Sequence, residues 1–171
     1  MPKAVYLWTG EGWGKTTSAL GVALRAIGHG KKVEIIQFMK GRKERIGEYK
    51  VRKRLGPSYS IHQFGRKGWV NLKKPSEHDT KLAHEGMHYA YEAIKKKPFL
   101  LILDEINIAT RIGLFKPKDV IDLLRAVPKE TTVYLTGRRA PPELIKRADY
   151  VCEIKDIKRK KGTTNKSGID Y

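Results

Sequence analysis

The sequence has little cysteine, no long apolar run and few acidic residues. Cys152 is the one cysteine in 171 residues, so no internal disulfide can form, and we expect a reducing, cytoplasmic setting. The longest apolar run, FLLIL at 99–103, is far shorter than the roughly 20 residues that cross a bilayer. The start MPKAVYLWTG has no signal-peptide pattern. We therefore expect a soluble protein with no membrane segment.

Acidic residues are outnumbered two to one by basic ones. Thirty-six Lys and Arg against 18 Asp and Glu give a formal net charge of +18, which attracts polyanions such as DNA, RNA and nucleotides. The basic residues occur in scattered clusters, such as RKER at 42–45, VRKR at 51–54 and KRKK at 158–161. The pattern leaves two interpretations open, a solvated surface and a polyanion-binding surface.

Short apolar runs alternate with amphipathic stretches along the whole chain. We expect strands at 4–9, 32–38, 59–64, 99–105, 131–137 and 150–158, and helices at 15–28, 48–55, 77–97, 116–127 and 141–148. The alternation predicts an α/β fold, a single P-loop NTPase-like (RecA-like) domain whose mostly parallel sheet is sandwiched by helices. We assign this domain to 1–158. The basic end of the chain, 159–171, has no apolar period and is predicted to be mobile.

The eight residues TGEGWGKT at 9–16 are typical of a phosphate-binding loop. A glycine-rich turn that leads into a helix N-terminus binds anions through free backbone N–H groups and the helix dipole. Lys15 adds a positive charge, and the Thr16 hydroxyl can ligate Mg²⁺. The strict pattern GxxxxGK[ST] is broken at Thr9, with Gly10 one residue closer to Gly14. The predicted nucleotide contacts in this segment are Thr9, Gly10, Glu11, Gly12, Trp13, Gly14, Lys15, Thr16 and Thr17.

Two later strand ends complete the predicted nucleotide site. The strand LLIL leads into Asp104 and Glu105, and either carboxylate can hold Mg²⁺ directly or through water. Both are candidate metal ligands together with Thr16, because the ends of parallel strands meet at one sheet edge. Arg138, in the segment LTGRRAPPE, is positioned to reach the phosphates.

Four blocks of the sequence resemble the ATP:corrinoid adenosyltransferases, the P-loop family of cob(I)alamin adenosyltransferases. They are YLWTGEGWGKTTSALGVALRAIGHGKKVEIIQFMKG, LLILDEINIA, YLTGRRAPPELIKRADYVCEI and the final GID, which together span nearly the whole chain. The resemblance implies transfer of the 5′-deoxyadenosyl group of ATP to the cobalt(I) of a reduced corrinoid, with release of triphosphate and with Mg²⁺ or Mn²⁺ as the metal. It implies Lys15, Thr16, Glu105 and Arg138 as catalytic residues, a homodimer, and a flavoprotein as reductant.

The resemblance also suggests residues outside the loop, and this chain departs from the family pattern at some of them. Arg25 and Lys40 match basic positions and are predicted nucleotide contacts. Phe64 and Trp69 are the predicted corrinoid contacts, although Asn71 stands where a second aromatic residue is expected. Within the loop, Trp13 replaces a usual lysine and Glu11 a small polar residue.

A second class of function competes with this one. A nucleic-acid-binding P-loop ATPase would also account for the net charge and for the DE strand end, although the sequence has no basic platform interleaved with aromatic residues for single strands. A small-molecule kinase would release ADP instead of triphosphate. The sequence leaves open which corrinoid is preferred.

Overall fold

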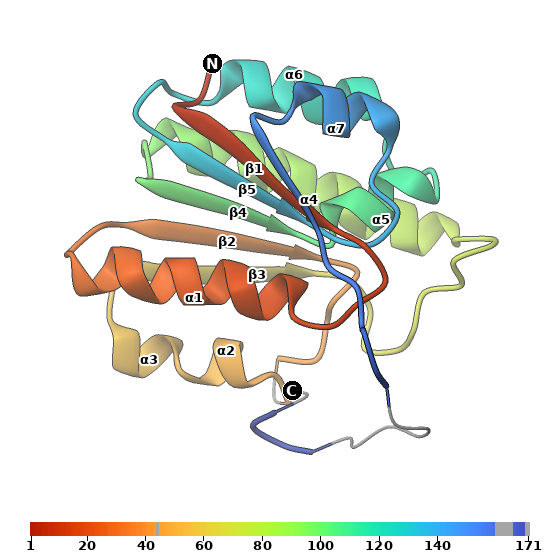
Figure 1. Cartoon of the computed structure of the whole chain (residues 1–171), viewed down its shortest axis with the longest axis horizontal. Helices are drawn as coiled ribbons and strands as arrows, with labels where there is room; N and C mark the ends of the chain where they lie inside the picture. The colour runs from red at the N-terminus through yellow and green to blue at the C-terminus, as the bar shows by residue number, and fades with distance from the viewer. Residues whose placement is uncertain (44, 160–165, 170–171) are drawn as a thin grey trace.

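The computed structural model of the chain describes residues 1–43, 45–159 and 166–169 (Figure 1). Its strands are β1 (Ala4–Thr9), β2 (Val33–Phe38), β3 (Tyr59–Phe64), β4 (Leu100–Asp104), β5 (Thr132–Thr136) and β6 (Tyr150–Glu153). Its helices are α1 (Lys15–Gly28), α2 (Gly47–Lys50), α3 (Arg52–Leu55), α4 (Glu77–Lys95), α5 (Ile106–Arg111), α6 (Pro117–Ala126) and α7 (Pro142–Arg147). The predicted alternation of strands and helices is confirmed.

All of these strands belong to one sheet. Within the described residues the strand order is β3-β2-β4-β5-β1-β6, and every neighbouring pair is parallel. Each residue of β2 and β4 is buried, as expected for strands covered on both faces. Because the strands run the same way, the segments that follow them meet at one edge of the sheet.

Helices cover both faces of the sheet (Figure 1). One apolar cluster joins the sheet to α4, α5, α6 and α7, and includes Met87, Ile106, Leu123 and Leu144. The other joins the opposite face to α1, where the small side chains of Ala19 and Ala23 let the helix lie close to Ile35 and Tyr134. The predicted α/β sandwich is therefore confirmed, with a sheet that is entirely parallel among the described strands.

The helix bounds follow from local signals where those signals are strong. At the start of α4, the Ser76 hydroxyl accepts a hydrogen bond from the Asp79 N–H at 3.2 Å, and the Asp79 carboxylate accepts one from the Ser76 N–H at 2.9 Å. This reciprocal capping box confirms Ser76 as the predicted cap. The predicted helix at 48–55 is two short helices, α2 and α3, and α5 was not predicted.

The predicted last strand, 150–158, is too long. β6 ends at Glu153, and the Ile154 carbonyl oxygen accepts a hydrogen bond from the Gly12 N–H at 2.9 Å. The chain therefore leaves the sheet edge and turns onto the glycine loop. The tail predicted to be mobile lies outside the described residues at 160–165 and 170–171. No helix among the described residues is long and apolar enough to span a bilayer.

Candidate active site

The glycine loop lies between β1 and α1, and its glycines serve two purposes. Gly14 is the N-cap of α1 with φ of 101°, a left-handed conformation that other residues adopt only with strain. A side chain on Gly12 would instead collide with the backbone, because its Cβ would lie 2.7 Å from the Ile154 carbonyl oxygen. The glycines thus permit close approach of the C-terminal segment as well as the turn itself.

Lys15 is 7% exposed, and its ammonium group donates a hydrogen bond to the Gly12 carbonyl oxygen. Burial lowers the pKa of Lys15, and the nearby positive charge of Arg138 lowers it further. The ammonium therefore lies within the turn of the loop, where a phosphate oxygen would compete with the Gly12 carbonyl for it.

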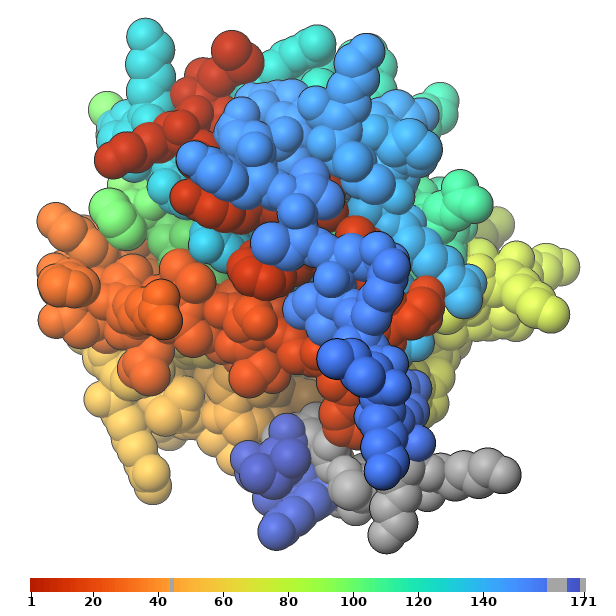
Figure 2. Space-filling model, viewed as in Figure 1, coloured from red at the N-terminus to blue at the C-terminus, as the bar shows by residue number. Residues whose placement is uncertain are grey.

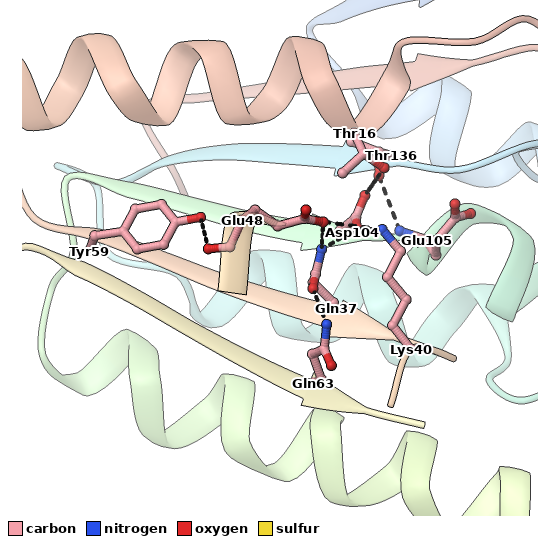
Figure 3. Close-up of polar contacts among 9 residues, drawn as sticks. All are labelled: Thr16, Gln37, Lys40, Glu48, Tyr59, Gln63, Asp104, Glu105 and Thr136. Carbon is pink, nitrogen blue, oxygen red and sulfur yellow. Dashed lines mark hydrogen bonds and ion pairs between the residues drawn. The ribbon is translucent and has the colours of Figure 1, made fainter. Parts of the chain in front are cut away.

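The Asp104 carboxylate at the end of β4 is the centre of a buried polar network (Figure 3). It is 1% exposed, and its Oδ1 accepts hydrogen bonds from the hydroxyls of Thr16 at 2.8 Å and Thr136 at 2.6 Å. Its Oδ2 accepts from Lys40 Nζ at 2.6 Å and from Gln37 Nε2 at 3.0 Å. Burial opposes ionisation, but the charge of Lys40 and the hydrogen bonds from Lys40, Thr136 and Thr16 together lower the pKa of Asp104. Asp104 is therefore an ionised carboxylate at neutral pH.

Lys40 follows β2, and the structure places it on Asp104. Burial disfavours its charged form, yet the carboxylates of Asp104, Glu105 and Glu48 raise the pKa of Lys40 above its ordinary value. The pair brings the ends of β2 and β4 together beside the Thr16 hydroxyl. The prediction that Lys40 contacts the nucleotide is not tested by these contacts and stays a prediction.

Gln37 connects this network to the segment that follows β2. Its amide nitrogen donates to Glu48 Oε1 at 3.1 Å, and its oxygen accepts from Gln63 Nε2 at 2.8 Å (Figure 3). Sequence reasoning missed Gln37, Glu48 and Thr136. The signal for the first was present, since a glutamine in the buried run VEIIQF needs polar partners.

Glu105 adopts a left-handed backbone conformation with φ of 63° and is the N-cap of α5. Burial raises the pKa of its carboxyl, and the charge of Asp104 raises it further. Thr16, Asp104 and Glu105 supply hard oxygen donors, which Mg²⁺ and Mn²⁺ prefer. The described residues contain no group of three or more His, Cys, Asp or Glu that could hold a metal alone. The chemistry of these three donors fits such an ion.

Arginines from the segment after β5 pair with Glu11 in the glycine loop. The Glu11 carboxylate pairs with Arg138 at 3.4 Å and with Arg139 at 3.1 Å. The predicted cation Arg138 is thus held next to the loop. Arg139 was not predicted as a site residue. Its own backbone is in the left-handed conformation, with φ of 50°.

The other predicted nucleotide contacts have different surroundings. Arg25 is exposed in the last turn of α1, ten residues after Lys15, which corresponds to about 15 Å along the helix axis. Thr17 is exposed in the first turn. The Thr9 hydroxyl accepts a hydrogen bond from the Ala140 N–H at 3.1 Å and so ties β1 to the segment after β5.

The two predicted corrinoid contacts have different surroundings. Phe64, at the end of β3, is partly buried and packs against Tyr89 with ring centroids 5.5 Å apart. Trp69 is 86% exposed, and the Arg42 guanidinium lies 5.2 Å from the centroid of its ring. Its carbonyl oxygen accepts a hydrogen bond from Arg66. The chain thus presents a large apolar ring to solvent beyond the end of β3.

Comparison with known proteins shows the family. Residues 2–171 match the family described as ATP:corrinoid adenosyltransferase BtuR/CobO/CobP. The chain belongs to this family. Its relatives include the corrinoid adenosyltransferase of Escherichia coli strain K12, which is 31% identical over 98% of this chain and 85% of that protein. The corrinoid adenosyltransferase of Pseudomonas aeruginosa is 32% identical over 95% of this chain and 81% of that protein.

Family membership makes the chain an enzyme that transfers an adenosyl group to a corrinoid, and implies ATP and a corrinoid as its substrates. Among solved structures, a KaiC-like protein from Pyrococcus horikoshii has a TM-score of 0.56 at 17% identity, covering 90% of this chain and 74% of that one. This likeness shows a shared fold.

Proposed function

We propose that this corrinoid adenosyltransferase moves the 5′-deoxyadenosyl group of ATP to the cobalt(I) of a reduced corrinoid and releases the three phosphates as intact triphosphate. The observation that carries the proposal is the convergence of Lys15, Thr16, Asp104 and Arg138 at one sheet edge around the glycine loop. These residues can bind a phosphate chain as a unit. A family named for ATP and corrinoid supplies the two reactants.

The reaction balances without a nucleophile from the protein. The cobalt(I) centre of the substrate gives an electron pair to the ribose 5′-carbon and becomes cobalt(III). A cobalt–carbon bond forms while the bond from C5′ to the phosphate oxygen breaks, and that oxygen leaves with its electron pair on the triphosphate. The work left to the protein is orientation, exclusion of water and stabilisation of the leaving group.

The charge that develops on the leaving group is met by the loop. Lys15 supplies an ammonium, and the α1 N-terminus supplies backbone N–H groups. Arg138 pairs with Glu11 of the loop, and its charge acts on Lys15. Lys15 and Arg138 are therefore proposed to stabilise the departing triphosphate, and Thr16 and Glu105 to act through the metal.

Thr16, Asp104 and Glu105 are the residues proposed to hold Mg²⁺ or Mn²⁺. When bound, such an ion neutralises part of the phosphate charge. Asp104 already orients the Thr16 hydroxyl through a hydrogen bond of 2.8 Å. The chain's own contribution is thus a fixed carboxylate and hydroxyl placed before the nucleotide arrives.

The corrinoid is proposed to lie beyond the ends of β2 and β3, against Phe64 and the exposed ring of Trp69. We further propose a flavoprotein reductant for the cobalt, a homodimer and a cytoplasmic location. A net charge of +18 favours docking of an acidic electron donor.

The test is to incubate the pure protein with ATP, Mg²⁺ and chemically reduced corrinoid. We expect the spectrum of an alkylated cobalt and one triphosphate per turnover. The Lys15→Ala variant should lose about 10²–10³ in rate, the loss expected for one preorganised donor. The matched control is Lys81→Ala, which removes an exposed lysine from α4. Formation of ADP without spectral change, or ATPase activity that depends on DNA, would contradict the proposal.

A further inference from the structure

The segment that follows β6, residues 154–159, lies against the glycine loop. Figure 2 shows the blue C-terminal residues in contact with the red N-terminal ones. The Gly12 N–H donates to the Ile154 carbonyl oxygen at 2.9 Å, and the Trp13 N–H donates to Asp156 Oδ1 at 3.0 Å. Two backbone donors of a phosphate-binding loop are thus bonded to this segment.

Arg159 brings a positive charge to the same place. Its Nε donates to Asp156 Oδ2 at 2.6 Å, and its Nη2 lies 3.4 Å from the Glu11 carbonyl oxygen. The guanidinium carbon is 5.8 Å from the centroid of the Trp13 ring. An open pocket of about 480 Å³ lies here, lined by Glu11, Gly12, Glu153, Lys155, Asp156 and Arg159.

Asp156 holds the partners that a phosphate group would take. Its carboxylate accepts from a loop N–H and pairs with a guanidinium, the two kinds of donor that bind phosphate oxygens. The hydrogen bond from Trp13, and then the hydrogen bond and charge of Arg159, lower the pKa of Asp156. A triphosphate carries more negative charge and more acceptor oxygens than one carboxylate, so it can displace Asp156 from both donors.

We propose that Arg159 determines specificity for the end of the triphosphate that extends past Gly12 and Trp13, with Asp156 as the carboxylate that competes with the phosphates for it. The proposal rests on the proposed function, because that function makes the triphosphate unit the ligand. The loop has Trp13 where the family pattern has a lysine, and the proposal assigns Arg159 from the C-terminal segment as a cation at this loop. On this proposal the Asp156 carboxylate weakens anion binding, because it occupies the same donors.

The first test measures the dissociation constant of inorganic triphosphate by calorimetry at fixed ionic strength, with the full chain. Arg159→Ala should weaken binding about tenfold, the loss of one charged hydrogen-bonding partner. On this proposal inorganic pyrophosphate should be affected less, because an anion with one phosphate fewer has fewer oxygens for Arg159 once it is bound at Lys15. The matched control is Lys158→Ala, which removes the same charge from an exposed neighbour that has no hydrogen bond or ion pair among the described residues.

The second test examines whether Asp156 competes with triphosphate for Arg159. Asp156→Asn should tighten triphosphate binding several-fold, and this gain should disappear when Arg159→Ala is also present. Glu153→Gln removes the same charge from the same pocket and should give the smaller gain of a general loss of repulsion. If the two changes have additive effects on the binding free energy of triphosphate, Asp156 acts only by repelling the anion. That result would overturn the inference.

Equal weakening by Arg159→Ala and Lys158→Ala would also overturn it, as would failure of the unchanged protein to bind triphosphate. The proposed function fails separately, if the unchanged protein forms no alkylated cobalt. Formation of that product together with indifference to Arg159 would keep the proposed function and reject this inference.

Discussion

Replacement of Lys40 by methionine is expected to destabilise the protein, because it leaves the Asp104 carboxylate without its cation. The two groups are 2.6 Å apart, with exposures of 24% for the lysine side chain and 1% for the aspartate. Loss of one partner from a fully buried pair costs about 3–5 kcal/mol. Water can reach the place of the partly exposed ammonium, and three other donors still bond Asp104. We therefore expect a loss of about 2 kcal/mol, near the value for one hydrogen bond to a charged group.

Urea unfolding at pH 7 measures this loss as a shift of the midpoint at constant slope. The control is Lys43→Met, which removes a second positive charge from the same basic segment. Lys43 is exposed and lies over the ring of Tyr49, 5.8 Å from its centroid. Its replacement should change stability by no more than about 0.5 kcal/mol. Equal effects of the two changes would mean that net charge, and not the buried pair, governs stability.

The pH dependence gives an independent check. The folded-state pKa of Asp104 lies below its ordinary value of 3.8, so its interactions contribute stability above that pH, and the contribution is lost as the pH falls through the folded-state pKa. Without Lys40, burial pushes the pKa of Asp104 upward, and the carboxyl is protonated at higher pH. The stability gap between the two proteins should therefore narrow on acidification from pH 7 toward pH 4. A gap that stays constant or widens would refute the reasoning.

Three further predictions concern the loop, the α4 cap and the metal ligands. Gly12→Ala should lower the melting temperature, because its Cβ would lie 2.7 Å from the Ile154 oxygen, whereas Gly21→Ala in α1 meets open space and should stabilise by about 0.5–1 kcal/mol. Calorimetry that finds both changes neutral would contradict this contrast. Ser76→Ala should cost about 1 kcal/mol in urea unfolding through loss of the capping box. Glu105→Gln should raise the Mg²⁺ concentration needed for half-maximal transfer. The raised pKa of Glu105 means that Mg²⁺ affinity of the unchanged protein should weaken with acidification more than that of the variant.

Much of the fold follows from local sequence signals. Strands β1 to β5 are apolar runs bounded by breakers, and α1 and α4 have clear N-terminal signals in Gly14 and Ser76. Helix α5 was missed because six residues are too few to show a helical period. β6 was predicted too long because the run YVCEIKDIK continues to alternate. After its end at Glu153, Ile154 bonds Thr9 and Gly12, two contacts with residues far away in the sequence.

The sequence predicts candidate site residues where they are concentrated in motifs, and not where their contacts depend on strand order. The glycine loop predicts Lys15 and Thr16 as phosphate and metal ligands, and the carboxylates after β4 are predicted metal ligands only as a pair of alternatives, Asp104 and Glu105. That Lys40 and Gln37 bond Asp104 follows from β2 lying next to β4, which no sequence signal fixes. The contacts of Asp156 and Arg159 likewise depend on β6 lying next to β1.

The position of β6 beside β1 has a consequence for biosynthesis. A ribosome makes the glycine loop among the first residues of the chain, but Ile154, which accepts the Gly12 hydrogen bond, comes more than a hundred residues later. A nascent chain that has emerged only as far as β5 therefore carries every glycine of the loop without the hydrogen bond from Gly12 to Ile154. The hydrogen bond between Gly12 and Ile154 can therefore form only after the last strand has left the exit tunnel.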